Sequence, residues 1–383
     1  MSETGFAARV EQWVFGRRKL LLVIFLLATV VLFGFATQTK IDAGFEKQLP
    51  QGHPYIETFT KYQSQFGGAN RVMIALMARD GDIFTPEYFT TLEAVTQEMY
   101  GMPGVDQSSV TSLFTPNVRF TEVVEDGFTG GNVVPSDFTP TPAGLAKVRE
   151  NALKSNYMGR LVTDSFNGTM VMANLLDIDP DTGERLDIFA LAKRLEELRV
   201  KHESDAVSVH IIGFAKVMGD VRDGALNVVF FFGVTVVLTS LLVWLYAQSF
   251  WFAALPLGCS MAAVAWQLGL LNRLGYGIDP MSILVPFLIF AIGVSHGVQM
   301  VRAFRAELFA GSDSLGAARS AFRQLLVPGS VALITDPIGF VTILLIPVPT
   351  IRELAIAASI GVAAIILTNL LLLPLLLSYQ KPR

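Results

Sequence analysis

The sequence predicts a polytopic α-helical membrane protein with six transmembrane helices and an α+β domain between the first and second helix. Three observations predict this fold. Hydrophobic residues make up 52% of the 383 residues and charged residues only 16%, below the roughly 25% of average soluble domains. Six apolar stretches reach the length of about 20 residues that a helix needs to cross a membrane. Most of the charge lies in one long segment after the first stretch.

The six apolar stretches carry few charged side chains. They are residues 20–37, 226–246, 251–271, 281–301, 325–346 and 354–377. Arg17, Arg18 and Lys19 precede the first stretch, as basic residues precede the apolar part of a signal peptide. The stretch is long and lacks a clear small-x-small cleavage site, so we interpret it as a retained helix that follows an N-terminal segment, residues 1–19.

Residues 38–222 contain no spanning stretch and predict an extracytoplasmic domain. Two strand–helix–strand patterns recur in it. The predicted strands are 71–78, 105–114, 168–176 and 206–212, and the predicted helices are 86–99 and 182–202. Two such passes predict an α+β sandwich of the split, ferredoxin-like kind. No compact polar cluster stands out in this domain, so the sequence does not identify a substrate pocket.

Two connecting segments allow more than one interpretation. Residues 126–142 are dense in Gly, Pro, Ser and Thr and predict a flexible loop or an extended arm, which either carries a function or is a solvated crossover. Residues 213–224 can continue as a helix into the second span. Such a helix would either transmit motion between the domain and the membrane or simply anchor at the membrane surface.

Residues 223–377 hold the five remaining stretches as one block, and residues 378–383 follow as a C-terminal segment. Basic residues in the short connections fall mainly on one side of the membrane. That side holds Arg9, Arg17, Arg18, Lys19, Arg302, Arg305, Arg319, Arg323, Lys381 and Arg383, and the other holds Arg273 and Arg352. This asymmetry predicts cytoplasmic termini and an outer location for residues 38–222. Residues 302–324 alternate arginines with large apolar residues, which predicts a cytoplasmic amphipathic helix at the membrane surface.

Motifs of soluble enzymes are missing. Cys259 is the single cysteine and lies within an apolar stretch, so neither an internal disulfide nor a cysteine metal cluster can form. The sequence has no HExxH, GxxxxGK[ST], GxSxG or CxxC motif. We therefore predict that the chain is not an enzyme and needs no cofactor, metal or nucleic-acid partner.

The fourth apolar stretch carries a cluster of small and polar residues. Gly293 and Gly297 are four residues apart and form a small-xxx-small face, on which another helix can pack closely. Ser295 and Gln299 share a face, and His296 adjoins it. The pattern predicts a polar strip beside a tight helix contact.

The fifth apolar stretch contains an acid, Asp336, between Thr335 and Pro337. Proline removes a backbone donor and leaves a carbonyl free to bind water. An ionisable side chain near the bilayer centre costs at least roughly 2.5 to 3.5 kcal/mol, so it persists only where the bundle interior, water or a partner receives it. Asp336 is therefore a candidate functional residue.

Asp336 and His296 together suggest proton movement. Histidine changes charge in the physiological pH range, and a carboxyl group in apolar surroundings takes up a proton more readily than in water. The full set of proposed relay residues is Asp336, His296, Ser295, Gln299, Thr335 and Asn369. Structural hydrogen bonds are the alternative. Interhelical hydrogen bonds also explain the amides Asn227, Gln267 and Asn369, of which only Asn369 joins the relay set.

The layout of one helix, a large outer domain and five helices resembles one repeat of the resistance-nodulation-division (RND) superfamily. The nearest resemblance is to its MMPL and hydrophobe-exporter branches, whose five-helix block is related to the sterol-sensing domain. Residues 293–296 lie where that branch commonly has Gly-x-Asp-Tyr, so its aspartate is absent here. Residues 335–340 match its Thr-Thr-x-Ile-Gly-Phe run, with Asp336 in place of a threonine and Gly339 and Pro337 as expected packing positions. We hypothesise that the protonatable carboxylate has moved to Asp336, with His296 as its partner.

The resemblance implies proton-driven export of a hydrophobic or amphiphilic, lipid-like substrate from the inner membrane of a bacterium, with a periplasmic outer domain. RND transporters usually contain two such repeats and this sequence contains one. It is therefore expected to be half of a longer transporter or to assemble as at least a dimer, in contact with membrane lipids. The rival interpretations are a lipid- or sterol-sensing binding or scaffold protein and an incomplete half-transporter.

Overall fold

The computed structural model describes residues 5–39, 45–66, 70–125, 127–176, 178–179, 183–184, 186–279 and 281–380. The chain forms two compact units, a helical unit of residues 1–56 and 224–383 and an outer domain of residues 57–223. Six helices in the described residues are long and apolar enough to cross a membrane. The predicted class, a polytopic helical membrane protein with a small α+β domain, is confirmed.

The helices of the helical unit follow the predicted spans closely. They are α1 (Phe6–Gly16), α2 (Arg18–Ala36), η1 (Phe45–Gln48), α7 (Phe214–Ala247), α8 (Phe250–Arg273), η3 (Ser282–Leu284), α9 (Val285–Phe309), α10 (Ser314–Ile343), α11 (Pro349–Ile365), the π-helical segment η4 (Ile366–Leu372) and α12 (Leu373–Leu377). As predicted, α7 runs without a break from Phe214 into the second span. The boundary between the two units falls within this helix.

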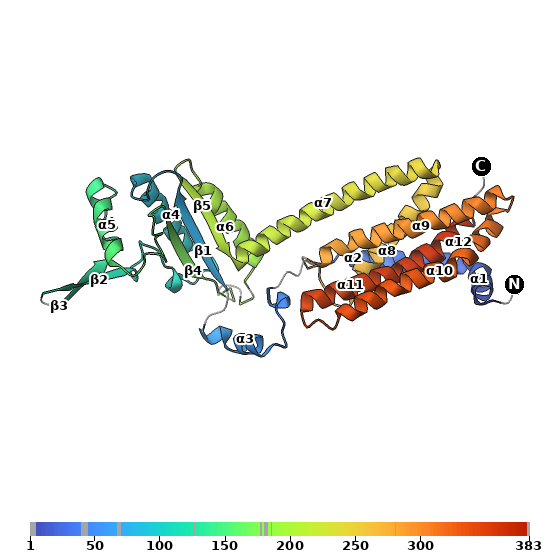
Figure 1. Ribbon diagram of the computed structural model, residues 1–383, viewed down its shortest axis with the longest axis horizontal. Helices are drawn as coiled ribbons and strands as arrows, with labels where there is room; N and C mark the ends of the chain where they lie inside the picture. The colour runs from blue at the N-terminus through green and yellow to red at the C-terminus, as the bar shows by residue number, and fades with distance from the viewer. Residues whose placement is uncertain are drawn as a thin grey trace. The chain divides into compact units, whose positions relative to one another are not determined.

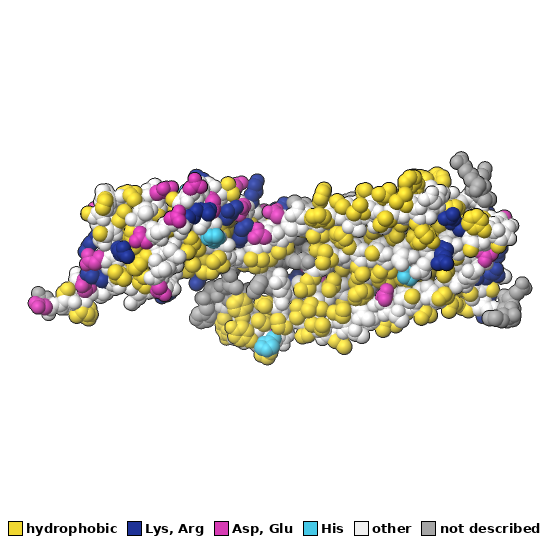
Figure 2. Space-filling model, turned by 45° about the horizontal axis from the view of Figure 1, so that its top comes forward, with side chains coloured by type: hydrophobic (Ala, Val, Ile, Leu, Met, Phe, Trp, Pro, Cys, Tyr) yellow, Lys and Arg dark blue, Asp and Glu magenta, His cyan; other side chains and the backbone are white. Residues whose placement is uncertain are grey.

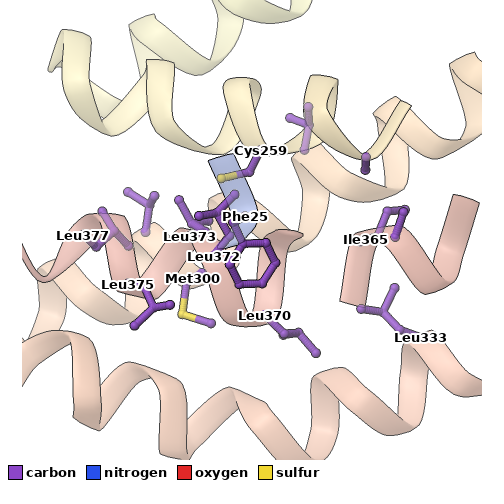
Figure 3. Close-up of a cluster of buried hydrophobic side chains, with 14 of the residues drawn as sticks. Phe25, Cys259, Met300, Leu333, Ile365, Leu370, Leu372, Leu373, Leu375 and Leu377 are labelled. Atoms are coloured by element: carbon purple, nitrogen blue, oxygen red, sulfur yellow. The ribbon is translucent and has the colours of Figure 1, made fainter. Parts of the chain in front are cut away.

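Helices α8, α9, α10 and α11 pack against one another, and α2 lies against α8 (Figure 1). The last span, α11 to α12, is the most buried of the six, whereas α2 and α7 expose most of their surface. Figure 3 shows how side chains from several helices, including Phe25, Cys259 and Leu373, point toward one another in the core. The surface is largely hydrophobic along the middle of this unit (Figure 2). Such an exposed apolar belt is what a lipid-facing bundle requires.

Residues 302–324 do not form the separate amphipathic helix predicted from the sequence. They complete α9 and begin α10, and the Asp313 side chain caps α10 by accepting a hydrogen bond from the Gly316 N–H at 2.9 Å. Two of the apolar residues expected at the membrane surface are instead buried, because Phe304 packs on α8 and Phe322 packs edge-on against Phe15 of α1, whereas Phe309 is exposed. The prediction of a separate helix is therefore wrong.

The start of α2 and the last described residues lie at the same end of the helical unit, where the Arg18 guanidinium lies over the Tyr379 ring (Figure 1). Helix α1, which the sequence analysis did not predict, packs there against α10, and the buried Glu11 forms an ion pair with Arg319. Lys and Arg side chains also gather at this end of the unit (Figure 2). A common side for these two segments is what six spans require.

Helices α8 and α9 approach closely at two glycines. A Cβ atom at Gly297 would lie 2.6 Å from Pro256 Cβ, and one at Gly293 would lie 2.8 Å from Ser260 Oγ. Neither distance leaves room for a methyl group, so these two positions set how close the helices come. A Cβ at Gly339, by contrast, would meet nothing within 4 Å. Gly339 therefore has no packing role within the described chain, contrary to the expectation from its motif.

The outer domain contains a three-stranded antiparallel sheet in the order β4–β1–β5. Its elements are α3 (Pro54–Phe66, which begins in the other unit), β1 (Arg71–Ala78), α4 (Pro86–Gly101), η2 (Gln107–Ser109), β2 (Arg119–Val124), β3 (Gly127–Asn132), α5 (Pro142–Lys154), β4 (Gly168–Asn174), α6 (Ile188–His202) and β5 (Val207–Gly213). In the sheet register, Ile74 of β1 pairs with Val171 of β4 and Ile211 of β5. Helices α4 and α6 pack on the sheet and on each other, and their apolar faces form one core with it.

The predicted strand at 105–114 is reduced to single bridges, from Val105 to Leu175 and from Thr111 to Met172. Asp106 interrupts it by accepting the Ser108 N–H at 3.0 Å and starting the short helix η2. The bridges still place this segment beside β4. The order therefore remains that of a split, ferredoxin-like sheet, with the second strand incomplete.

The Gly-rich segment at 126–142 is not wholly a loop. Within its described part, residues 127–132 form β3, which pairs with β2 in a hairpin. The glycines are needed because the strands approach closely, and a Cβ at Gly130 would lie 2.4 Å from the Phe120 carbonyl oxygen. The predicted helix at 182–202 begins at Ile188, and residues 180–182 and 185 lie outside the described residues.

We predict that Gly297→Ala lowers the stability of the detergent-solubilised chain by about 1 to 3 kcal/mol, because the new methyl group would force α8 and α9 apart. Gly233→Ala is the matched control, because Gly233 is exposed on α7 and a Cβ there would meet nothing within 4 Å. It should leave stability unchanged or raise it by up to about 1 kcal/mol, because alanine favours a helix over glycine. Thermal unfolding measures both, and equal effects of the two changes would contradict the close contact.

A second prediction concerns Glu196, which accepts a hydrogen bond from Arg199 and lies 3.0 Å from Lys216 Nζ. The hydrogen bond from Arg199 lowers the pKa of Glu196 most. Desolvation raises this pKa, Lys216 lowers it further, and the net result is a pKa of about 2 instead of 4.5. A lowered pKa in the folded state stabilises the protein above about pH 4.5, and this stabilisation is lost as the pH falls through about 2.

Glu196→Gln should therefore speed hydrogen exchange of the α6 amides at pH 7 and have little effect near pH 2. The effect is expected to stay below about 1 kcal/mol, because the carboxylate is partly exposed. Glu197→Gln is the control, since Glu197 is exposed and lies 3.9 Å from its lysine partner. The assignment is refuted by a Glu196→Gln effect that does not change with pH.

Candidate functional site

His296 lies on α9 and is half-buried, while Ser295 and Gln299 are exposed on the same helix. The Nδ1 atom of His296 is 3.0 Å from the Ile292 carbonyl oxygen. A carbonyl oxygen can only accept, so Nδ1 carries the proton and donates it to this bond. The other ring nitrogen, Nε2, is therefore the atom that can take up or release a proton.

Asp336 lies on α10 with its side chain exposed, and Thr335 beside it donates its hydroxyl to the Ala332 carbonyl oxygen at 2.7 Å. Helix α10 continues through Pro337, which cannot donate to the carbonyl one turn earlier. Its neighbours about one turn away on the same face, Ala332 and Gly339, are apolar and also exposed. A carboxyl group therefore lies on an otherwise apolar face of a membrane-spanning helix.

The sequence analysis placed Asp336 and His296 on neighbouring helices, and α9 does pack against α10. Within the part of the chain that the structure describes, Asp336 makes no hydrogen bond or ion pair, and none joins it to His296. In a single copy of the chain, the Asp336 side chain is therefore neither buried in the bundle nor paired with another described side chain.

Asn369 lies in the bundle interior, within η4, and is fully buried. Its Nδ2 donates to Thr368 Oγ1 at 3.2 Å, while its Oδ1 has no partner among the residues that the structure describes. The Asn369 side chain lies beside the point where α8 and α9 come close together. A Cβ atom at Gly293 would lie 3.2 Å from its Nδ2, and one at Gly297 would lie 3.0 Å from its Oδ1. The π-helical turn around Asn369 is of a kind that often marks functional sites.

Gln267 is a second buried amide, and the sequence analysis explained it by interhelical hydrogen bonding. The described part of the chain contradicts that explanation, because both the oxygen and the nitrogen of its side chain are buried there without a hydrogen-bond partner. A buried polar group without a protein partner needs water or another ligand. The interior of the helical unit therefore contains two amides, Gln267 and Asn369, that are able to bind water.

Another polar cluster, which the sequence analysis missed, lies where η1 and η3 meet the start of α11. Lys47 Nζ is 2.8 Å from Glu353 Oε1, and the buried Asp279 caps η3 by accepting the Ser282 N–H at 3.0 Å. No group of three or more His, Cys, Asp or Glu residues that could hold a metal ion occurs among the described residues. These contacts tie chain segments together and suggest no chemistry.

Comparisons with known proteins agree with this architecture. A family model described as MMPL family matches residues 50–381. A protein of Methanocaldococcus jannaschii, named as a membrane protein, is 22% identical over 370 residues, which cover 94% of this chain and 90% of the relative.

The fold is also similar to the crystal structure of a heavy metal efflux pump, with a TM-score of 0.49 and 11% sequence identity. That similarity covers 96% of this chain and 48% of the pump chain, so the chain spans about half the length of the pump. The family match covers most of the chain. The chain therefore belongs to the MMPL family.

Proposed function

We propose that this chain exports a hydrophobic or amphiphilic substrate across or out of the membrane, and that protons moving through Asp336 and His296 drive the export. Membership of the MMPL family supports a transporter rather than an enzyme. The observation that carries the proton-driven step is the unpartnered Asp336 on the apolar face of α10. Secondary active transport and the lipid-like nature of the substrate are parts of the proposal.

The energetic argument starts from the cost of that position. An ionised carboxylate facing hydrocarbon costs at least roughly 2.5 to 3.5 kcal/mol, whereas the protonated form carries no charge. The carboxyl group would therefore bind a proton when its surroundings are apolar and release it when they are hydrated. His296 fits as the exchanging partner because Nδ1 is held by the Ile292 carbonyl and Nε2 is left for proton transfer. Ser295, Gln299 and Thr335 are the polar groups of the same two helices that would line the path, and Asn369 would hold water deeper in the bundle.

We also propose that a second copy of the chain packs on this face of α10 and buries Asp336. The face of α10 around this residue is apolar and exposed, with Ala332 and the open Gly339 about one turn away. A twofold interface presents the same patch from both copies, so one such contact would enclose two carboxyl groups. The similarity to half of a longer pump chain favours pairing of two copies. The site would be incomplete without the second one.

The proposed location is a bacterial inner membrane with the outer domain in the periplasm. The supporting observation is the gathering of Lys and Arg at the end of the helical unit that holds the start of α2 and the last described residues (Figure 2). Loops rich in these residues stay on the cytoplasmic side. The orientation is open to test by labelling cysteines introduced on each side of the membrane.

The first prediction of the proposal is that Asp336→Asn abolishes proton flux by the purified chain in liposomes, because the amide cannot bind and release a proton. His296→Ala should reduce the flux at least tenfold. Asp205→Asn is the matched control, since Asp205 is an exposed acid of the outer domain, and it should leave the flux unchanged. Flux that is indifferent to the first two changes would favour the lipid-binding scaffold instead.

The second prediction is that a cysteine at Gly339 crosslinks two copies in the membrane, because Gly339 lies one turn from Asp336 on the proposed interface. The native Cys259 is buried and should not react. A cysteine at Val30, which is exposed on α2, is the control and should give no covalent dimer. Equal yields from the two positions would indicate random collision and contradict the proposed interface.

A further inference from the structure

The outer domain contains a polar cavity of about 350 Å³ at the free edge of β4. Its lining includes Arg71, Thr111, Asn117, Tyr157, Arg160 and Asn174. This is a compact polar cluster that the sequence analysis did not find, because its residues come from four separate segments. Its volume lies at the lower end of the range of about 300 to 1,000 Å³ for small-molecule sites.

The cavity exists because β4 has no continuous neighbour on that edge. One bridge joins Val162 to Thr169 near the start of the strand, and another joins Thr111 to Met172 near its end. The walls of the cavity come from the segments on either side of the bridged residues, 157–161 before Val162 and 109–117 around Thr111. Leu161 and Met172 contribute an apolar part of the lining.

Most neutral donors in the cavity are already used within the domain. The Tyr157 hydroxyl donates to the Asn117 carbonyl oxygen at 3.1 Å, and the Thr111 hydroxyl donates to the Ser109 carbonyl oxygen at 3.1 Å. The Ser109 hydroxyl donates to the Asp106 carbonyl oxygen at 2.7 Å. These bonds fix the walls and leave little hydrogen-bonding capacity for a neutral sugar or peptide.

The two guanidinium groups are the charged donors that remain, beside the Nδ2 amide of Asn174. Among the described residues Arg71 uses only its Nε, which donates to Asn174 Oδ1 at 3.1 Å, and neither of its Nη groups makes a hydrogen bond there. The Arg160 side chain makes no hydrogen bond to any residue that the structure describes. Neither arginine forms an ion pair with a described carboxylate, and no Asp or Glu is among the described lining residues. The cavity therefore carries an uncompensated positive charge.

We propose that this cavity binds a phosphate-type oxyanion, either free or as the headgroup of an amphiphile. Guanidinium groups bind phosphate through paired N–H donors, and such charge-assisted bonds are stronger than neutral ones. The apolar part of the lining would accept the first carbons of a chain attached to the phosphate. The proposal concerns equilibrium binding in the outer domain. Its test therefore does not depend on proton coupling at Asp336.

The test measures binding of inorganic phosphate and of hexyl phosphate to the full chain in an uncharged detergent, by isothermal titration calorimetry at low salt. Hexyl glucoside is the neutral probe with the same chain length. The binding variants are Arg71→Gln and Arg160→Gln. Arg194→Gln is the matched control, because Arg194 is an exposed arginine of the same domain on α6, outside the cavity.

Hexyl phosphate is expected to bind, and each binding variant should weaken it at least tenfold, which corresponds to about 1.4 kcal/mol. Arg194→Gln should have no effect, and added salt should weaken binding further. Binding of inorganic phosphate as well identifies the anion itself as sufficient, whereas binding of hexyl phosphate alone identifies an amphiphile headgroup site. Both outcomes support the proposal.

Absence of binding by both phosphate probes would overturn the proposal, as would binding that is unchanged in Arg71→Gln and Arg160→Gln. Equal binding of hexyl glucoside would also overturn it, because the interaction would then be apolar. Arg160→Gln keeps the test valid if Arg71→Gln disturbs the fold, since Arg71 bonds to Asn174 and the Arg160 side chain bonds to no described residue. Circular dichroism of each variant checks the fold.

Discussion

Hydrocarbon provides no hydrogen bonds, and this constraint shapes the helical unit. Each spanning segment satisfies its backbone internally as a helix, and side chains that cannot be satisfied have to be buried, hydrated or covered. In lipid the hydrophobic effect does not drive helices to associate. Close packing of small residues stabilises their contacts instead. Gly293 and Gly297 provide that contact between α8 and α9. The buried amides Asn369 and Gln267 lie in the same interior.

The same constraint distinguishes Asp336 from the other polar residues of the spans. Thr335 and Thr368 satisfy their hydroxyls on a carbonyl of their own helix, which costs the bundle nothing. Asp336 has no such bond among the described residues, and its side chain is exposed on α10. A structural acid would be expected to cap a helix, as Asp313 and Asp279 do. The position of Asp336 is costly in a single copy, and that cost is the physical reason for assigning it a function.

The spans could be predicted from sequence because a run of about 20 apolar residues has few other stable structures. Two features of the outer domain could not. Asp106 and Ser109 replace a strand by local side-chain bonds, and the glycines around Gly130 form a tight hairpin instead of a loop. The candidate site was located by residue type alone, since a uniformly apolar helix such as α10 gives no periodicity to show which face meets its neighbours. The arginine cavity could not be predicted from sequence, because its lining residues lie far apart along the chain and come together only in the fold.

Infrared difference spectroscopy on the reconstituted chain tests the central claim most directly, because it observes the protonation of a single carboxyl group in the membrane. The spectrum is recorded while the pH is changed, for the wild type and for Asp336→Asn. The account predicts a carboxylic acid band that appears and disappears with pH in the wild type and is absent from Asp336→Asn. An identical set of bands in the two proteins would contradict it, because Asp336 would then exchange no proton.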